Sequence, residues 1–183
     1  DMDFSDPASY KEHLIANNRE SNSTGTLAEV FAKTGLKSNT ISDKRIAVLN
    51  SAASMLGVGQ YTWAAGHAGE FGVGDDPPKN NQVYYEFDCS GYVSWCFMKN
   101  NLQDYPVSSS GFYSIFSRIS AEDLLPGDIV TCDSHVMIFV NKDSSGNYWF
   151  IDDGGGGPGT IRGGPSDSVG VRLRTVKIYL INK

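Results

Sequence analysis

The stretch Asp88-Cys89-Ser90-Gly91-Tyr92 decides how the rest of this chain is interpreted. It follows an aromatic, strand-like run at 84–87 and opens a predicted helix that continues over 92–99. A cysteine in the first turn of a helix lies among unpaired backbone N–H groups and near the positive end of the helix dipole. Both effects favour the thiolate, the nucleophilic form of cysteine. The stretch therefore predicts a nucleophile at Cys89, with its own N–H as a candidate oxyanion donor.

A partner for this cysteine lies in the second half of the chain. His135 begins an apolar run, so we expect it at the start of a strand. If the following hairpin closes in its simplest register, Asp152 or Asp153 lies near this histidine and fixes its tautomer. We prefer Asp152, because we expect Phe150 and Asp152 to face inward and Ile151 to face outward. A cysteine at a helix start facing a histidine on a sheet predicts nucleophilic catalysis.

The order of the predicted elements indicates an α+β fold. Helices are expected at 6–15, 27–33, 42–56, 92–99 and 112–116, and strands at 129–131, 135–141, 147–152, 169–173 and 177–181. Because helices precede strands, we expect N-terminal helices, with the cysteine at a helix start, packed on a C-terminal antiparallel sheet. Ser42 is the expected N-cap of the helix at 42–56. Residues 1–41 are predicted to be an N-terminal extension or linker, and residues 42–183 the catalytic domain.

Charge and composition exclude several classes of function. The net charge of −6 and the pI near 4.9 argue against binding to nucleic acid or to anionic membranes. The sequence contains no run of about 18 apolar residues, so no membrane span is expected.

The cysteines predict neither a disulfide nor a metal site. Cys89 and Cys96 lie about 10 Å apart on one predicted helix, too far for a disulfide, and we expect Cys96 to be a buried hydrophobe. The spacing of Cys132 and His135 suits zinc, but no second ligand pair exists, and we expect no metal or cofactor.

A segment rich in Gly, Asp, Pro and Asn separates two of the motifs. Residues 67–82 are expected to form a surface loop, which either walls one side of the site or is a tolerated insertion. His67 begins this loop. We interpret His67 as a surface residue, with a contact to substrate as the alternative.

Four motifs in order resemble the NlpC-type bacterial cell-wall peptidases. They are Tyr61-x-Trp63, Asp88-Cys89-Ser90-Gly91, Leu125-Pro126-Gly127-Asp128-Ile129-Val130 and His135-Val136-x-Ile138. The resemblance covers about residues 43–183. It implies a papain-like fold and hydrolysis of peptidoglycan stem peptides, typically at the bond between γ-D-glutamate and the diamino acid. It also implies extracellular or wall-associated action.

The resemblance assigns catalytic roles to three residues. Cys89 is the implied nucleophile and His135 the general base and acid. The third polar residue of the family maps to Asp152. This position holds Asp where the family commonly has His, so Asp153 stays open as the alternative.

The resemblance also assigns roles in binding. Tyr61 is placed near the cysteine and the oxyanion, and Trp63 belongs to the same motif. Asp88 and Ser90 match positions that bind the amine of a free N-terminal L-alanine in some family members. Two departures concern this side of the site: Ala64-Ala65 replaces a glycine pair, and the segment up to Asp88 is longer than usual.

Three other functions are compatible with the same residues. A CHAP-type amidase would cut a different amide of the wall with a similar Cys–His pair. A non-catalytic module would bind the wall through the same groove, and an acyltransferase would pass the acyl group to an amine. Since the chain begins Asp1-Met2-Asp3, we interpret it as a piece of a larger multidomain, wall-associated protein.

Overall fold

The computed structural model describes residues 26–56, 60–61, 63–67, 86–132, 135–155 and 168–176. Its elements are α2 (Leu27–Thr34), the 3-10 turn η1 (Ser38–Thr40), α3 (Asp43–Ser54), β1 (Gln60–Tyr61), β2 (Glu86–Phe87), α4 (Cys89–Met98), α5 (Phe112–Ile115), η2 (Ala121–Asp123), β3 (Ile129–Cys132), β4 (His135–Lys142), β5 (Tyr148–Gly155) and β6 (Ser168–Val176). The helix expected at 6–15 and the strand expected at 177–181 lie outside the described residues.

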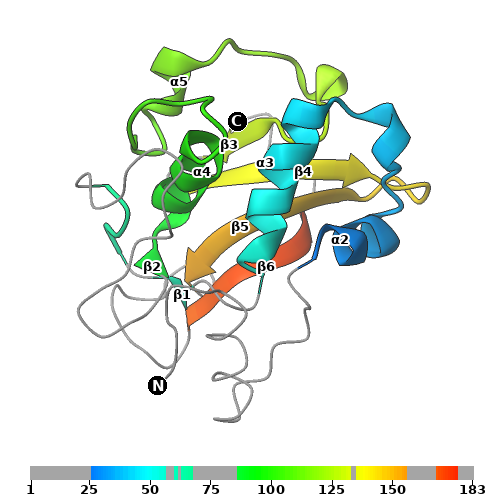
Figure 1. The fold of residues 1–183 in the computed structure, drawn as a ribbon, viewed down its shortest axis with the longest axis horizontal. Helices are drawn as coiled ribbons and strands as arrows, with labels where there is room; N and C mark the ends of the chain where they lie inside the picture. Colours follow the sequence, from blue (N-terminus) through cyan, green and yellow to red (C-terminus); the bar gives the residue numbers. More distant parts are fainter. Residues whose placement is uncertain are drawn as a thin grey trace.

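The described strands form one main sheet and one small parallel pair. The main sheet has the order β3-β4-β5-β6, with every neighbouring pair antiparallel, and β1 pairs with β2 in parallel. In Figure 1, α3 and α4 lie in front of this sheet, and α5 lies beyond the end of α4 that is farther from β2. Helices thus precede the antiparallel sheet along the chain, and the predicted α+β class is confirmed.

Helix α4 is buried over its whole length. All ten residues from Cys89 to Met98 are buried, as expected for a helix between two packed layers. The ring of Phe87 lies 5.7 Å from that of Tyr92, and the Tyr92 hydroxyl donates to the carbonyl of Ala52 on α3 at 2.9 Å. Cys96 is fully buried with a free thiol, as predicted. The helix begins at Cys89, three residues before the run predicted from sequence.

Both faces of the main sheet are covered. Alternate residues of β4 pack against the helices, and the residues between them pack in a smaller cluster on the opposite face. Ile151 is fully buried in the helix-side core, while Phe150 is buried in the opposite cluster. The expectation that Ile151 faces outward is therefore wrong, because the sheet has apolar layers on both sides.

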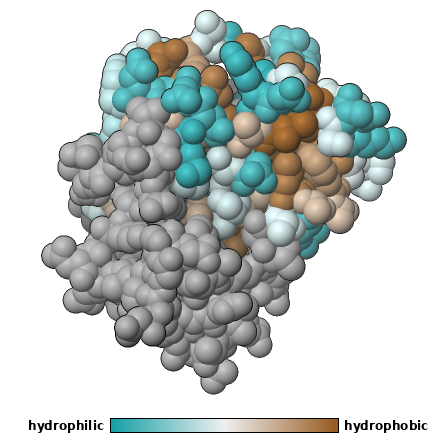
Figure 2. All heavy atoms as spheres, in the orientation of Figure 1, coloured by the Kyte–Doolittle hydropathy of each residue, from teal (hydrophilic) through white to brown (hydrophobic). Residues whose placement is uncertain are grey.

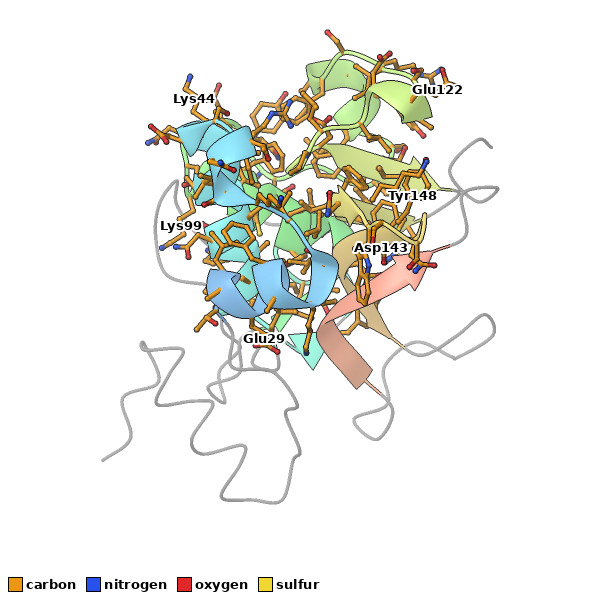
Figure 3. All side chains as sticks on the ribbon, turned by 90° about the vertical axis from the view of Figure 1, so that its right-hand side faces the viewer. Glu29, Lys44, Lys99, Glu122, Asp143 and Tyr148 are labelled. Carbon is orange, nitrogen blue, oxygen red and sulfur yellow. The ribbon has the colours of Figure 1, made fainter. Side chains whose placement is uncertain are left out.

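The β4–β5 hairpin contains a bulge that sets its register. Ile138 pairs with Ile151 and Phe139 with Phe150, but Asn141 pairs with Trp149, so one extra residue of β4 lies between these pairs. Asp143 organises the turn, accepting the N–H of Asn147 at 2.9 Å and the indole N–H of Trp149 at 2.8 Å. Figure 3 shows Asp143 and Tyr148 close together at this end of the hairpin. A shift of one residue in strand pairing exchanges the two faces of a strand, so the bulge determines which residues of β5 lie on the same face as a given residue of β4.

The Leu125-Pro126-Gly127-Asp128 motif connects the sheet to α3. Gly127 adopts a φ of 90°, a conformation that glycine favours. Oδ2 of Asp128 accepts the N–H of Leu125 at 2.7 Å, and its Oδ1 accepts from Arg45 on α3 at 2.7 Å. The motif therefore fixes the start of β3 against the helical layer.

The described part of the N-terminal segment packs on the core. Val30 of α2 is fully buried, and the side-chain amide of Asn141 on β4 donates to the carbonyl of Thr34 at 2.8 Å. Ser42 takes the N-cap position of α3 as expected, but its side chain makes no capping hydrogen bond. The division of the chain at residue 42 stays a prediction.

On the face drawn in Figure 2, hydrophilic and apolar side chains are intermixed over the described part, and the largest apolar area lies right of the centre. Several large apolar side chains are exposed: Trp63, Tyr105, Tyr113, Ile119 and Leu125. Among the helices that the structure describes, none is long and apolar enough to cross a membrane.

The turn that follows β1 packs on the first turn of α4. The carbonyl of Ala65 accepts the N–H of Asp88 at 3.1 Å. A Cβ atom at Gly91 would overlap this carbonyl oxygen, so the glycine permits the close approach. Ala64, which replaces a glycine in the expected pair, has a φ of 64°. This left-handed conformation is strained for alanine.

Substitution Ala64→Gly is expected to raise the free energy of unfolding by about 1 kcal/mol, because it relieves this strain. Urea unfolding followed by circular dichroism measures the change. Ala65→Gly is the matched control. Ala65 is not among the residues with positive φ, so glycine relieves no strain there and only increases the conformational entropy of the unfolded chain, and this variant should be less stable than wild type. A loss of stability in both variants would contradict the strain at Ala64.

Candidate active site

The candidate nucleophile is the first residue of α4. Asp88 is the N-cap, and its Oδ1 accepts the N–H of Gly91 at 2.8 Å. Cys89 is 7 % exposed, so its thiol lies at the edge of the core. Backbone N–H groups of Ser90 and of Val136 on β4 hydrogen-bond to its sulfur. The second of these donors directly follows His135, so the thiol and the histidine lie on adjacent elements.

The electrostatics of this thiol differ from the prediction. Burial raises the pKa of Cys89 to about 11, and the charge of Asp88 and then that of Asp153 act in the same direction. The N–H groups of Val136 and Ser90 lower the pKa but do not offset burial. The expectation that Cys89 is a thiolate is therefore wrong for the chain without a substrate. Desolvation and two carboxylates favour the neutral thiol more strongly than the helix N-terminus favours the thiolate.

The histidine and the carboxylate chosen from sequence form a dyad. Nε2 of His135 lies 2.6 Å from Oδ2 of Asp152. The side chain of His135 is 25 % exposed, and that of Asp152 is fully buried. A buried carboxylate on one ring nitrogen holds the imidazole in place and leaves the other nitrogen for proton transfer.

Asp153 points to the other face of the sheet. Continuing the register from Ile138 and Ile151 places Asp153 opposite Val136, on the helix side. It is fully buried, and its charge contributes to the raised pKa values of Cys89 and Tyr61. Asp153 therefore belongs to the surroundings of the thiol, and Asp152 to those of the histidine.

Tyr61 lies within the site, as the motif implied. Its pKa is raised to about 12 by burial and then by the neighbouring Cys89, Asp88 and Asp153. The phenol is therefore a neutral hydrogen-bonding group beside the thiol. Trp63 is 57 % exposed and lies at the surface of the turn, where a ligand can reach it.

His67 contacts Asp88 and Ser90 at the start of α4, which sequence reasoning did not predict. Its Nε2 atom lies 2.6 Å from Oδ1 of Asp88 and 3.1 Å from Oγ of Ser90. The interpretation as a plain surface residue is wrong. His67 and Asp88 are 21 residues apart, and no sequence motif links residues at that spacing. The one sequence feature that could have indicated the contact is the position of His67 four residues after Trp63. Residues 68–82 of the expected loop lie outside the described residues.

A pocket of about 430 Å³ lies beside these residues rather than on them. It is lined by α5, the segment after it and β3, including Tyr113, Arg118 and Thr131. The Thr131 hydroxyl donates to that of Tyr113, and Thr131 pairs with Val136 on β4. Within the described ranges, no group of three or more His, Cys, Asp or Glu side chains is arranged to hold a metal ion.

Comparison with known proteins identifies the family. The sequence pattern of the NlpC/P60 family matches residues 58–161, more than half of the chain. The chain belongs to the NlpC/P60 family. The resemblance of the four motifs is thereby confirmed, and the cysteine helix packed on an antiparallel sheet agrees with a papain-like fold.

One relative is "Probable endopeptidase p60" from Listeria welshimeri. It is 39 % identical to this chain over 61 residues, which are 31 % of this chain and 12 % of that protein. The matched part of this NlpC/P60 chain thus spans a small share of the relative.

In this NlpC/P60 chain, Asp152→Ala is expected to lower peptidase turnover by about a hundredfold or more, because His135 loses the group that orients it. Asp152→Asn keeps an acceptor for the imidazole N–H and should retain more turnover. Fragment release followed by chromatography measures both rates, with circular dichroism as the control for folding. Undiminished turnover in Asp152→Ala would remove Asp152 from the dyad.

A second prediction concerns acid stability. Burial raises the pKa of Asp88, but hydrogen bonds from His67, Gly91 and Ser90 hold it below its ordinary value of 3.8. The ionised carboxylate thus contributes stability above that ordinary pKa, and the contribution is lost as pH falls through the folded pKa. Asp88→Asn, which keeps an N-cap side chain, should lower the free energy of unfolding by about 1 kcal/mol at pH 7.

The difference between wild type and Asp88→Asn should shrink as pH falls below 3.8, which urea unfolding across a pH series measures. A difference that is constant across the series would show that the charge of Asp88 contributes nothing.

Proposed function

We propose that this chain is a peptidoglycan endopeptidase that cleaves stem peptides, at the bond between γ-D-glutamate and the diamino acid. The observation that carries the proposal is that the N–H of Val136 on β4 hydrogen-bonds to the sulfur of Cys89 at the start of α4, while the preceding residue, His135, contacts Asp152. Membership of the NlpC/P60 family supports the choice of a wall peptide as substrate and an extracytoplasmic place of action. The substrate contacts come from Tyr61 and Trp63.

The first half-reaction acylates the cysteine. Because the pKa of Cys89 is about 11, the resting nucleophile is a thiol, and its proton moves to His135 as the sulfur attacks the amide carbonyl. Asp152 stabilises the imidazolium that forms. The backbone N–H of Cys89, with the neutral phenol of Tyr61, lies near the developing oxyanion. Acylation is complete when the imidazolium of His135 protonates the leaving amine of the diamino acid and the C–N bond breaks.

The second half-reaction releases the acyl group. Neutral His135 then takes a proton from water, which attacks the thioester and yields a free γ-D-glutamate carboxylate and the Cys89 thiol. No step uses a metal or an organic cofactor.

The test compares wild type with Cys89→Ala on purified muropeptides, with products analysed by mass spectrometry. Wild type should give new fragments that end at γ-D-glutamate, and Cys89→Ala should give none, since it lacks the nucleophile. Circular dichroism of the variant is the control for folding, and the fold should stay intact because alanine replaces a buried side chain of similar size.

Other outcomes identify the rival functions. A cut between the lactyl group of the sugar and L-alanine would indicate an amidase. New amide products formed only when an amine acceptor is added would indicate an acyltransferase. No fragments from walls of either diamino acid type would favour a binding module, and fragments from Cys89→Ala would overturn the mechanism.

A further inference from the structure

A second histidine–carboxylate pair lies beside the nucleophile, in addition to the catalytic dyad. Nε2 of His67 lies 2.6 Å from Oδ1 of Asp88, and Oγ of Ser90 lies 3.1 Å from the same nitrogen. The His67 side chain is 25 % exposed and that of Asp88 is 12 % exposed. The imidazole is therefore the more exposed partner of a contact that adjoins the first turn of α4.

The carboxylate in this pair is ionised at neutral pH. Oδ1 of Asp88 accepts hydrogen bonds from the imidazole of His67, from the hydroxyl of Ser90 at 3.0 Å and from the N–H of Gly91 at 2.8 Å. Burial raises the pKa of Asp88, but these bonds hold it below the ordinary value. A full negative charge thus stands one peptide bond from Cys89.

A negative charge at this position opposes ionisation of the nucleophile. Coulomb attraction holds the proton on a thiol more tightly when a carboxylate is near, and burial strengthens the effect. The charges of Asp88 and Asp153 act on the thiol, and Tyr61 on β1 lies near it. Other titratable groups on the elements packed there are Tyr92 on α4, His67 in the turn after β1, His135 on β4 and Asp152 on β5. Both tyrosines are neutral, because their pKa values are raised.

The imidazole of His67 is placed to weaken the field of Asp88. It donates Nε2–H to the carboxylate, and when protonated it adds a positive charge at 2.6 Å. We propose that His67 is a positioning residue for the nucleophile, which compensates the charge of Asp88 so that the proton of Cys89 can pass to His135. The inference rests on the proposed role of Cys89 as nucleophile. His67 keeps its own proton throughout.

The test measures the reactivity of the thiol directly. Iodoacetamide is reacted with the folded chain between pH 6 and pH 11, and peptide mass spectrometry follows the alkylation of Cys89 separately from that of the other cysteines. His67→Ala should raise the apparent pKa of Cys89 by about one unit and slow alkylation at pH 7 about tenfold. Asp88→Asn should shift both in the opposite direction.

The double variant separates compensation from structural support. In the Asp88→Asn background no charge is left to compensate, so His67→Ala should change the alkylation rate by less than about twofold. Equal slowing in both backgrounds would show that His67 only supports the turn, and no slowing in either would show that it has no influence. Either result overturns the proposal.

Two further variants complete the design. His67→Gln keeps an N–H donor near the position of Nε2, so it should slow alkylation less than His67→Ala. If His67→Ala does not fold, the comparison of wild type with His67→Gln replaces it. Asp128→Asn removes a carboxylate that is paired with Arg45 and directly precedes β3, at the end away from His135. It should leave the alkylation of Cys89 unchanged. A change there equal to that of His67→Ala would overturn the specific role of His67.

The alkylation assay uses no peptidoglycan, so the two proposals fail separately. Coupling between His67 and Asp88 in a chain that cleaves no muropeptide would defeat the proposed function alone. Cleavage of muropeptides by wild type without that coupling would defeat the role of His67 alone.

Discussion

The candidate site depends on the burial of α4 between α3 and the main sheet. A helix buried on every side cannot shift or rotate without opening the core, so the position of Cys89 is set by the packing of Tyr92 and Trp95. The helix is tied to α3 through the Tyr92 hydroxyl and to the turn after β1 through Ala65. The polar atoms of Asp88 and Ser90 are hydrogen-bonded at its N-terminal end.

The same burial creates the electrostatic difficulty of the site. A thiol that is removed from water and surrounded by Asp88 and Asp153 resists ionisation, which explains its raised pKa. The helix N-terminus alone does not overcome this cost. In the proposed mechanism, activation comes from neighbouring side chains, and two histidines lie on segments that pack near the start of α4: His135 on β4 and His67 in the turn after β1.

Much of the fold was predictable because its signals are local. Apolar periodicity and turn residues marked the helices and strands, and the four ordered motifs marked Cys89, His135 and Tyr61. The errors share one cause, which is that they concern non-local packing. Ile151 was assigned outward because strand alternation does not say whether a second apolar layer covers the other face. The thiolate was expected because a sequence does not show how deeply a thiol is buried.

The sequence by itself determined the α+β class, the NlpC/P60 motifs and the cysteine–histidine pair, since each depends on residue types at short or ordered spacings. The tertiary structure decided which carboxylate meets the histidine. A one-residue bulge between Phe139 and Asn141 turns Asp152 toward His135 and Asp153 toward the helices, and a bulge leaves no clear mark in sequence. It likewise decided the place of His67, because a contact with Asp88 across 21 residues arises from the packing of the turn on α4.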